Sequence, residues 1–162
     1  MTSSSFQFDH IHVATDHAGL EHKNAVRDWL QEEGYSVTDF GAFVPNPEDD
    51  FPIFIGQATR IVSQYPHQAA IIFGGSGQGE AILANRFPNV RAAVYYGGPE
   101  EIVPLSRSHN DSNVLSIGAR FVDIDTTKRV IWEWLHTPAD PSEKYQRRNQ
   151  QIAHISKQIR VT

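Results

Sequence analysis

Residues 69–86, AAIIFGGSGQGEAILANR, decide the fold of this chain. The apolar run 70–73 leads directly into the glycine-rich turn 74–79, and Glu80 then opens a segment with helical character. A continuous apolar run bounded by glycines is typical of a central strand that is buried on both faces. A turn that enters a helix presents main-chain N–H groups to an anion. The stretch therefore predicts a strand–loop–helix unit of an α/β protein with a functional loop.

The charge of Glu80 separates this loop from phosphate-binding loops. A Walker-type loop carries Lys and Ser or Thr where this chain has Glu80 and Ala81, and a carboxylate would repel a phosphate. The dinucleotide fingerprint G-x-G-x-x-G is not met by Gly75, Gly77 and Gly79. Two interpretations remain open from this segment. Glu80 either takes a proton beside a carbonyl whose oxygen becomes anionic, or it only complements the helix dipole.

Strand and helix patterns alternate along the rest of the chain. Strands are predicted over 8–14, 35–40, 69–73, 91–96 and 113–117. Helices are predicted over 20–33 with Gly34 as the C-terminal cap, over 51–65, from Gly79 to near Pro88, within 97–109 as a short or kinked helix because of Pro104, over 126–136, and from Ser142 onward. This alternation predicts βαβ units, and hence a parallel sheet with helices on both faces in a single domain, 1–162.

Composition narrows the class of protein. With 162 residues, 40% hydrophobic and 20% charged, the chain is typical of one globular domain. A net charge of −5 argues against a nucleic-acid or anionic-membrane partner, and no apolar run is long enough to span a bilayer. The chain has no cysteine, which excludes disulfides and thiolate metal sites. We expect a cytoplasmic protein without a secretion signal, with disorder over residues 1–5.

Several polar residues follow directly after the predicted strands. Asp16, His17, the loop 74–80 and Arg120 all occupy such positions, and ligands bind beyond the carboxyl ends of parallel strands. We therefore expect these residues along one edge of the sheet. The pair 109–110 precedes a strand, so His109 would reach that edge only at the end of the preceding helix or from a neighbouring subunit.

Histidines on the first strand raise the question of a metal. His10 and His12 alternate and would share one strand face. A third ligand with suitable spacing is not evident, so the sequence predicts no metal site.

With these positions in place, the chain resembles the type B ribose-5-phosphate isomerase family, which also includes galactose-6-phosphate isomerase subunits. Any one of the shared motifs is a weak signal, but their order along the chain makes the set specific. The motifs are TDHAG at 15–19, GGSGQGE at 74–80, ANR at 84–86, RSHND at 107–111, NVLSIGAR at 113–120 and, more loosely, YQRR at 145–148.

The resemblance implies a Rossmann-like three-layer α/β/α fold with a five-stranded parallel sheet. It also implies a homodimer or tetramer whose active site is shared between subunits, with no cofactor. The implied reaction interconverts ribose 5-phosphate and ribulose 5-phosphate. The family uses as base either a cysteine early in the glycine loop or a glutamate at its end. This chain has Gly74 near the first position and Glu80 at the second, so it resembles the glutamate branch.

The resemblance also assigns roles to residues. Glu80 would act as base through a cis-enediolate and His109 would open the sugar ring. Main-chain N–H groups from Ser76 to Glu80 would stabilise the enediolate. The remaining substrate-binding residues would hold sugar hydroxyls or phosphate; they are Asp16, His17, Gly75, Ser76, Gly77, Gly79, Asn110, Arg120, Lys144 and Arg148.

The sequence departs from the family pattern at two places. Lys144 and Tyr145 stand where Arg and His are common, and Arg147 competes with Arg148 as the matching arginine. The segment 97–104, with two glycines and two prolines, replaces a regular helix that lines the sugar pocket in the family. An isomerase of allose 6-phosphate or galactose 6-phosphate, and a sugar-phosphate binding protein without turnover, therefore remain alternatives.

Overall fold

Five parallel strands form the central sheet of the structure, a computed structural model that describes residues 7–159. The strands are β1 (Ile11–Thr15), β2 (Val37–Asp39), β3 (Ala69–Gly74), β4 (Ala92–Tyr95) and β5 (Val114–Gly118), in the spatial order β2-β1-β3-β5-β4. Every neighbouring pair is parallel, and Thr15 pairs with Phe73 while Gly74 pairs with Gly118. The strands β1, β3 and β5 therefore end together at one edge.

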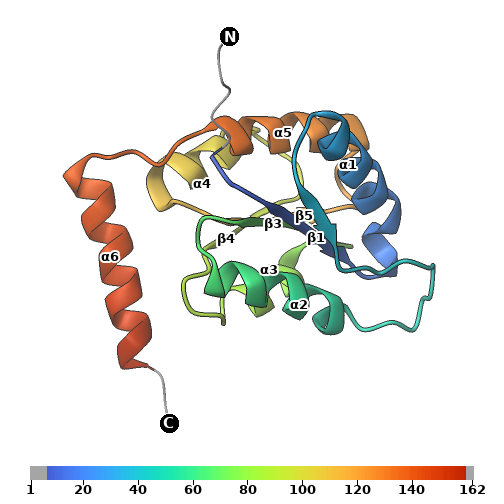
Figure 1. Ribbon diagram of the computed structural model, residues 1–162, viewed down its shortest axis with the longest axis horizontal. Coiled ribbons are helices and arrows are strands. Elements are labelled where there is room, and N and C mark those ends of the chain that lie inside the picture. The colour runs from blue at the N-terminus through green and yellow to red at the C-terminus, as the bar shows by residue number, and fades with distance from the viewer. Residues whose placement is uncertain (1–6, 160–162) are drawn as a thin grey trace.

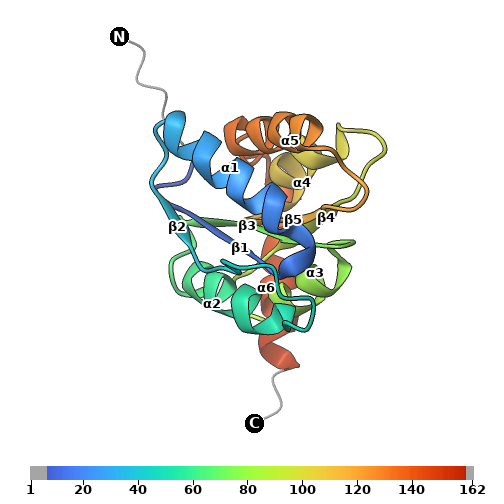
Figure 2. The ribbon, with the colours of Figure 1, turned by 90° about the vertical axis from the view of Figure 1, so that its right-hand side faces the viewer.

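Helices cover both faces of this sheet. They are α1 (Leu20–Glu32), α2 (Phe51–Gln64), α3 (Gln78–Ala84), α4 (Ile102–Asn110), α5 (Ile124–His136) and α6 (Glu143–Gln158), with a 3-10 turn η1 (His17–Gly19) before α1. Figure 1 shows α1, α4 and α5 above the sheet and α2 and α3 below it. The view in Figure 2 shows the same two helical layers from the side. The predicted three-layer α/β/α fold is confirmed.

Burial explains why β3 lies at the centre. All six of its residues are buried, as are all five of β1 and of β5. One apolar cluster joins the sheet to α1 and α5 through residues such as Leu30, Ile131 and Trp134. A second cluster joins the other face to α2 and α3 through Ile55, Val62 and Ala84. A strand between two such layers needs an unbroken apolar sequence, which the run 70–73 supplies.

Element boundaries differ from the sequence prediction at a few places. The first strand begins at Ile11 rather than at residue 8, and the second has only three residues. Pro104 lies in the first turn of α4, where main-chain N–H groups have no partner within the helix. The helix α4 therefore begins at Ile102, after Pro99, and is shorter than the segment 97–109. Gly34 follows α1 with a φ of 90°, as its predicted capping role requires.

The helix α6 stands apart from the two layers. It contributes no buried residue, and Ile152, Ile155 and Ile159 are 49%, 54% and 68% exposed. Figure 1 shows it beside the body, at the opposite end from the loop 41–50. A groove of about 840 Å³ separates its inner side from the segment 85–93.

Residues 1–5, which the sequence predicts to be disordered, lie outside the described residues. Among residues 7–159, no helix combines the length and apolar character needed to cross a membrane.

Candidate active site

The carboxyl ends of β1, β3 and β5 gather one group of polar residues. We name this group the rim cluster; its members are Asp16, His17, Asp49, the glycine loop 74–79, Glu80 and Arg120. Asp16 and His17 follow β1, the loop follows β3, and Arg120 follows β5. The in-register strand ends bring Asp16 and His17, the loop and Arg120 together, as the sequence predicts, and Asp49 joins them from the loop before α2.

Glu80 lies inside the rim cluster rather than on its surface. Its residue is 5% exposed, and it belongs to the first turn of α3. A Cβ added at Gly74 would lie 2.0 Å from Glu80 Oε1, so the carboxylate occupies the space that a side chain at position 74 would fill. Burial raises the pKa of Glu80, the hydrogen bond from its own main-chain N–H opposes this rise, and the charge of Asp16 adds to it. A carboxylate with a raised pKa is a stronger proton acceptor than an exposed one.

Main-chain contacts fix the glycine loop against β5. Gly77 adopts a φ of 76°, a region that favours glycine, and its carbonyl accepts a hydrogen bond from Ser116 Oγ at 2.7 Å. The N–H of Arg120 donates to the Gly75 carbonyl at 3.1 Å. A Cβ at Gly75 would lie 3.0 Å from the guanidinium of Arg120. The loop thus presents bare backbone to the space beside Arg120.

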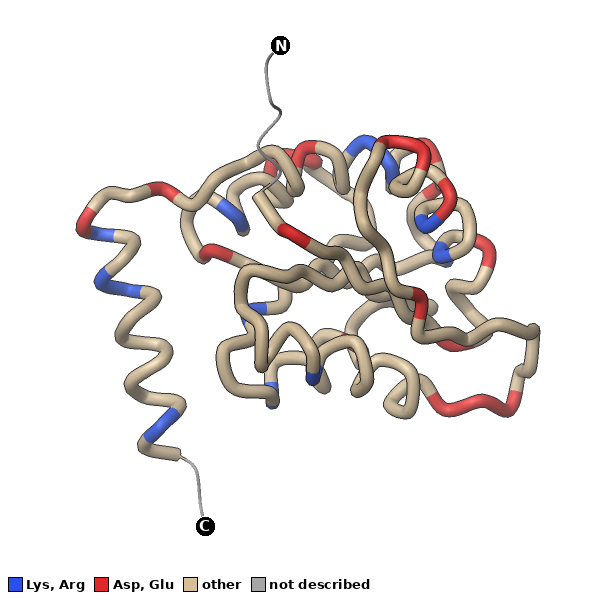
Figure 3. The backbone as a smooth tube through the Cα atoms, viewed as in Figure 1, with Lys and Arg blue, Asp and Glu red and all other residues tan. Residues whose placement is uncertain are grey.

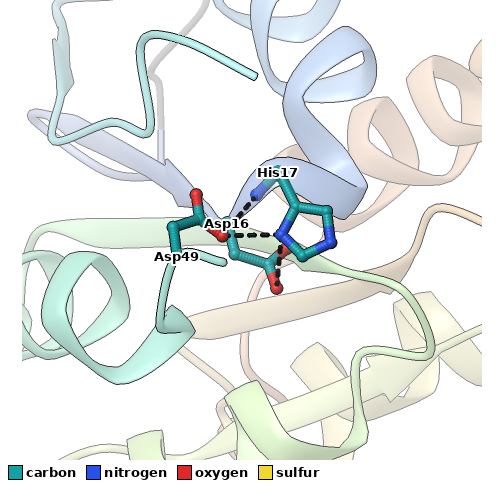
Figure 4. A group of neighbouring side chains, drawn as sticks. All are labelled: Asp16, His17 and Asp49. Atoms are coloured by element: carbon teal, nitrogen blue, oxygen red, sulfur yellow. Dashed lines mark hydrogen bonds and ion pairs between the residues drawn. The ribbon is translucent and has the colours of Figure 1, made fainter. Parts of the chain in front are cut away.

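His17 forms a compact group with two carboxylates (Figure 4). Its Nδ1 lies 2.6 Å from Asp49 Oδ1 and 4.0 Å from Asp16 Oδ2. Its main-chain N–H donates to the same Asp49 oxygen at 3.1 Å. The hydrogen bond to Asp49 raises the pKa of His17, partial burial lowers it, the charges of Asp16 and Asp49 raise it, and Arg120 lowers it. The imidazole of His17 and the guanidinium of Arg120 therefore lie close enough at this edge to interact electrostatically.

The same three side chains offer ligand atoms within 4.8 Å of one another. Two ligands of one zinc ion, each about 2.1 Å from the metal, stand roughly 3 Å apart or more. The 2.6 Å between His17 Nδ1 and Asp49 Oδ1 is instead the length of a short hydrogen bond. The observed geometry is that of a hydrogen bond between two side chains.

A second group of predicted site residues lies elsewhere. We name it the amino-edge cluster, and it consists of His109, Asn110, Lys144, Tyr145 and Arg148. The imidazole of His109, at the end of α4, stacks on the Tyr145 ring at 4.3 Å with a 9° interplanar angle. Lys144 Nζ lies 5.3 Å from the same ring. Asn149 donates to the His109 carbonyl at 3.2 Å, which fastens α6 to α4.

The two clusters lie at opposite edges of the sheet. The amino-edge cluster adjoins the start of β5, whereas the rim cluster adjoins its end. Five residues of extended strand span roughly 15 Å. Within one subunit, His109 therefore does not reach Glu80. Of the two routes that the sequence left open for His109, the structure removes the one through its own subunit.

A family model described as Ribose/Galactose Isomerase matches residues 11–152. The chain belongs to this family.

It is 34% identical over 139 residues to ribose-5-phosphate isomerase B of Mycolicibacterium paratuberculosis, which covers 85% of this chain and 86% of the relative. It is also 30% identical to D-erythrulose-4-phosphate isomerase of Pectobacterium atrosepticum, with 77% and 81% covered. Among solved structures, ribose-5-phosphate isomerase B from Mycoplasma genitalium with bound ribulose-5-phosphate matches with a TM-score of 0.86 at 28% identity, covering 91% of this chain and 96% of the other. These findings confirm the predicted family and fold, and the chain is an isomerase.

Asp49 is the member of the rim cluster that sequence reasoning missed. It lies in the loop before α2, and its carboxylate is 8% exposed although the loop around it is mostly exposed. The run Glu48-Asp49-Asp50 showed that this loop is acidic but gave no partner. The contact with His17 spans 32 positions, so only the fold reveals it.

Proposed function

We propose that this isomerase interconverts ribose 5-phosphate and ribulose 5-phosphate through a cis-enediolate, with Glu80 as the base. The observation that carries the proposal is the buried Glu80 carboxylate, set beside a loop of glycine backbone with its pKa raised by burial. Glu80 takes the proton from C2 and returns it at C1. The relative with bound ribulose-5-phosphate supports the substrate class.

The developing negative charge falls on the sugar oxygens beside the base. Main-chain N–H groups between Ser76 and Glu80 would stabilise these oxygens, and within this stretch Ser76 and Gln78 are the exposed residues. Asp16, whose side chain is 13% exposed, holds sugar hydroxyls on the other side. The loop thus accommodates a transient anion even though its own side chain is a carboxylate.

The substrate phosphate binds apart from the base. His17 and Arg120 supply two cations within the subunit. Lys144 and Arg148 lie four residues apart on α6, hence on one helical face, and both are exposed. Arg147 instead pairs with Glu143 at 2.6 Å, which favours Arg148 as the phosphate ligand.

We infer that a complete site needs two copies of the chain, as a dimer or within a tetramer. His109 opens the sugar ring from the partner subunit, because its own Glu80 lies at the other edge of the sheet. The exposed isoleucines of α6 and the adjoining groove offer the apolar surface for such an association. The cations of α6 would reach the phosphate in the same way.

A different sugar phosphate is the second candidate substrate. The segment before α4 runs as an irregular chain from Gly97 and follows β4 at the carboxyl edge, next to Phe121. In the family a regular helix of this segment lines the sugar pocket, so the irregular form would alter the pocket wall. One relative is named D-erythrulose-4-phosphate isomerase, after a sugar phosphate with one carbon fewer than ribulose 5-phosphate. A hexose 6-phosphate is the third candidate substrate.

The test is a panel of ribose 5-phosphate, erythrulose 4-phosphate, allose 6-phosphate and galactose 6-phosphate, with aldose–ketose conversion followed directly. We expect the highest kcat/KM with ribose 5-phosphate. Glu80→Gln should lower kcat by about 100- to 10,000-fold, the usual contribution of a general base, and Glu80→Asp by less. Unchanged turnover in Glu80→Gln would remove Glu80 as the base. Binding of every sugar phosphate without conversion would identify a binding protein instead.

A further inference from the structure

Asp49 makes two hydrogen bonds to one residue. Its Oδ1 atom accepts from the main-chain N–H of His17 at 3.1 Å and from the imidazole Nδ1 at 2.6 Å. The side chain reaches His17 from the loop before α2, so it links two segments that are far apart in the sequence (Figure 4). Asp49 belongs to none of the motifs that identify the family, and it needs an account of its own.

We propose that Asp49 is a positioning residue, which holds His17 as an imidazolium with Nδ1–H turned toward the protein and Nε2–H directed to the substrate phosphate. This inference rests on the proposed function, because it assigns the phosphate to His17 and Arg120.

Hydrogen-bond chemistry fixes the direction of the proton. A carboxylate can only accept, so Nδ1 carries the hydrogen in the 2.6 Å contact. The second bond, from the main chain of the same residue, prevents Asp49 from swinging away when the ring moves. With Nδ1 occupied, Nε2 is the ring atom left for a ligand. A phosphate oxygen accepts hydrogen bonds, and a charged donor makes the stronger one.

The burial of the second carboxylate oxygen of Asp49 also supports an imidazolium at His17. Its other oxygen, Oδ2, is buried and has no hydrogen-bond partner among the described residues. Its charge is therefore compensated chiefly through Oδ1, by His17. A buried carboxylate compensated in this way favours a cation next to it.

Three other charged groups face His17. Asp49 and Asp16 favour the imidazolium, whereas Arg120 opposes it. If the Asp49 carboxylate is lost, the 4.0 Å contact with Asp16 alone opposes Arg120 and the partial burial of the ring. The pKa of His17 should then fall below its value in the unmodified protein. Asp49 thus decides whether the phosphate meets one cation or two within the subunit.

The test compares Asp49→Asn with Glu48→Gln, which removes a charge from an exposed neighbour in the same loop. We expect Asp49→Asn to raise KM for ribose 5-phosphate about tenfold, with kcat within about threefold, because a charged hydrogen bond to phosphate is weakened. The inhibition constant of inorganic phosphate should rise in parallel. Both increases should be larger at pH 8 than at pH 6. Glu48→Gln should change neither constant.

A direct reading comes from NMR titration of the His17 ring, assigned with a His17→Gln variant. We expect His17 to titrate above pH 6.5 in the unmodified protein and lower in Asp49→Asn. An unchanged titration, or unchanged phosphate inhibition, would overturn the proposal. If Asp49→Asn does not fold, the unmodified protein still tests the proposal. A His17 pKa at or below the ordinary value of histidine would then overturn it. The titration of His17 and the binding of inorganic phosphate can be measured even if no sugar phosphate is isomerised. Failure of the proposed function can therefore be distinguished from failure of the proposal for Asp49.

Discussion

The rim cluster and the amino-edge cluster differ in how the subunit supports them. In the rim cluster, Glu80, Asp49 and Asp16 are mostly buried. Asp16 follows the buried strand β1, Glu80 lies in the first turn of α3, and Asp49 is bonded to His17. In the amino-edge cluster, Lys144 and Arg148 are exposed on a helix that buries no residue. Figure 3 shows the contrast in charge, with acidic positions gathered in the loop before α2 and basic positions repeated along α6.

This difference separates two tasks of one reaction. Proton transfer needs a base of tuned pKa in a fixed place, which requires burial. Phosphate binding needs cations that the ligand can reach, and the exposed Lys144 and Arg148 would add such cations to His17 and Arg120 of the rim cluster. The rim cluster is therefore preorganised within the chain, whereas under our proposal the amino-edge cluster would act only after two copies associate.

The largest effect is expected where a side chain would displace the base. Gly74→Ala places a methyl group 2.0 Å from Glu80 Oε1 and should lower kcat at least about 100-fold. The matched control is Gly56→Ala, where a Cβ meets nothing within 4 Å inside α2. That variant should keep full activity and gain about 0.5–1 kcal/mol of stability. Equal kcat in Gly74→Ala and the unmodified enzyme would contradict the observed position of Glu80.

Mixing two inactive variants tests whether the clusters meet across subunits. Glu80→Gln and His109→Asn are each expected to be nearly inactive alone. In randomly exchanged dimers, half of the molecules carry one copy of each variant, and one of their two sites is then intact. Roughly a quarter of the unmodified activity should return.

Subunit exchange in that experiment is verified by native mass spectrometry. Activity no greater than the sum of the two variants, despite proven exchange, would show that each subunit carries its own complete site.

The pH dependence of activity tests the role of Glu80 as the base. Glu80 must be ionised to accept a proton, and burial raises its pKa above the ordinary 4.5. Activity should therefore begin to fall, as the pH is lowered, at a higher pH than an exposed glutamate would give. The acid limb of kcat/KM measures this directly. If the acid limb of kcat/KM lies at the same pH in Glu80→Asp, a group other than Glu80 controls it.

Stability should move in the opposite direction to activity. A raised pKa means that the folded state binds the Glu80 proton more tightly than the unfolded state does. The ionised carboxylate thus lowers stability at neutral pH, and the penalty disappears as the pH falls through the raised pKa. Glu80→Gln should raise Tm at pH 7 by a few degrees, as about 1 kcal/mol does in a domain of this size. Calorimetry at pH 7 and pH 4 would show the gain only at pH 7.

The smallest effect concerns the exposed helix. Lys144 acts as a point charge, whereas arginine can hold a phosphate through two parallel hydrogen bonds. Lys144→Arg should lower KM about threefold without changing kcat. Arg147→Lys serves as the control, because Arg147 pairs with Glu143. A change of kcat in Lys144→Arg would place this residue nearer to the reacting carbons than we propose.

The sequence predicted most of the fold because its signals are local. The run 70–73 and the turn 74–79 identified the central strand and its loop, and the positions of Asp16 and Arg120 after strands identified the edge where they meet. The start of α4 was harder to predict, because Pro104 is compatible with a kink inside a helix or with the first turn of one. Pairings between distant segments, such as Asp49 with His17, depend on tertiary packing and left no local trace. The strand order β2-β1-β3-β5-β4 was beyond reach for the same reason.

The contact between Gly74 and the Glu80 carboxylate constrains how such a site can change over time. One volume is open either to a reactive group carried by the end of β3 or to one carried by the start of α3, and it does not hold both. An ancestor that exchanged one solution for the other would have had to alter both positions together, or pass through an inactive intermediate. Descendants should therefore inherit the residues at 74 and 80 as a pair.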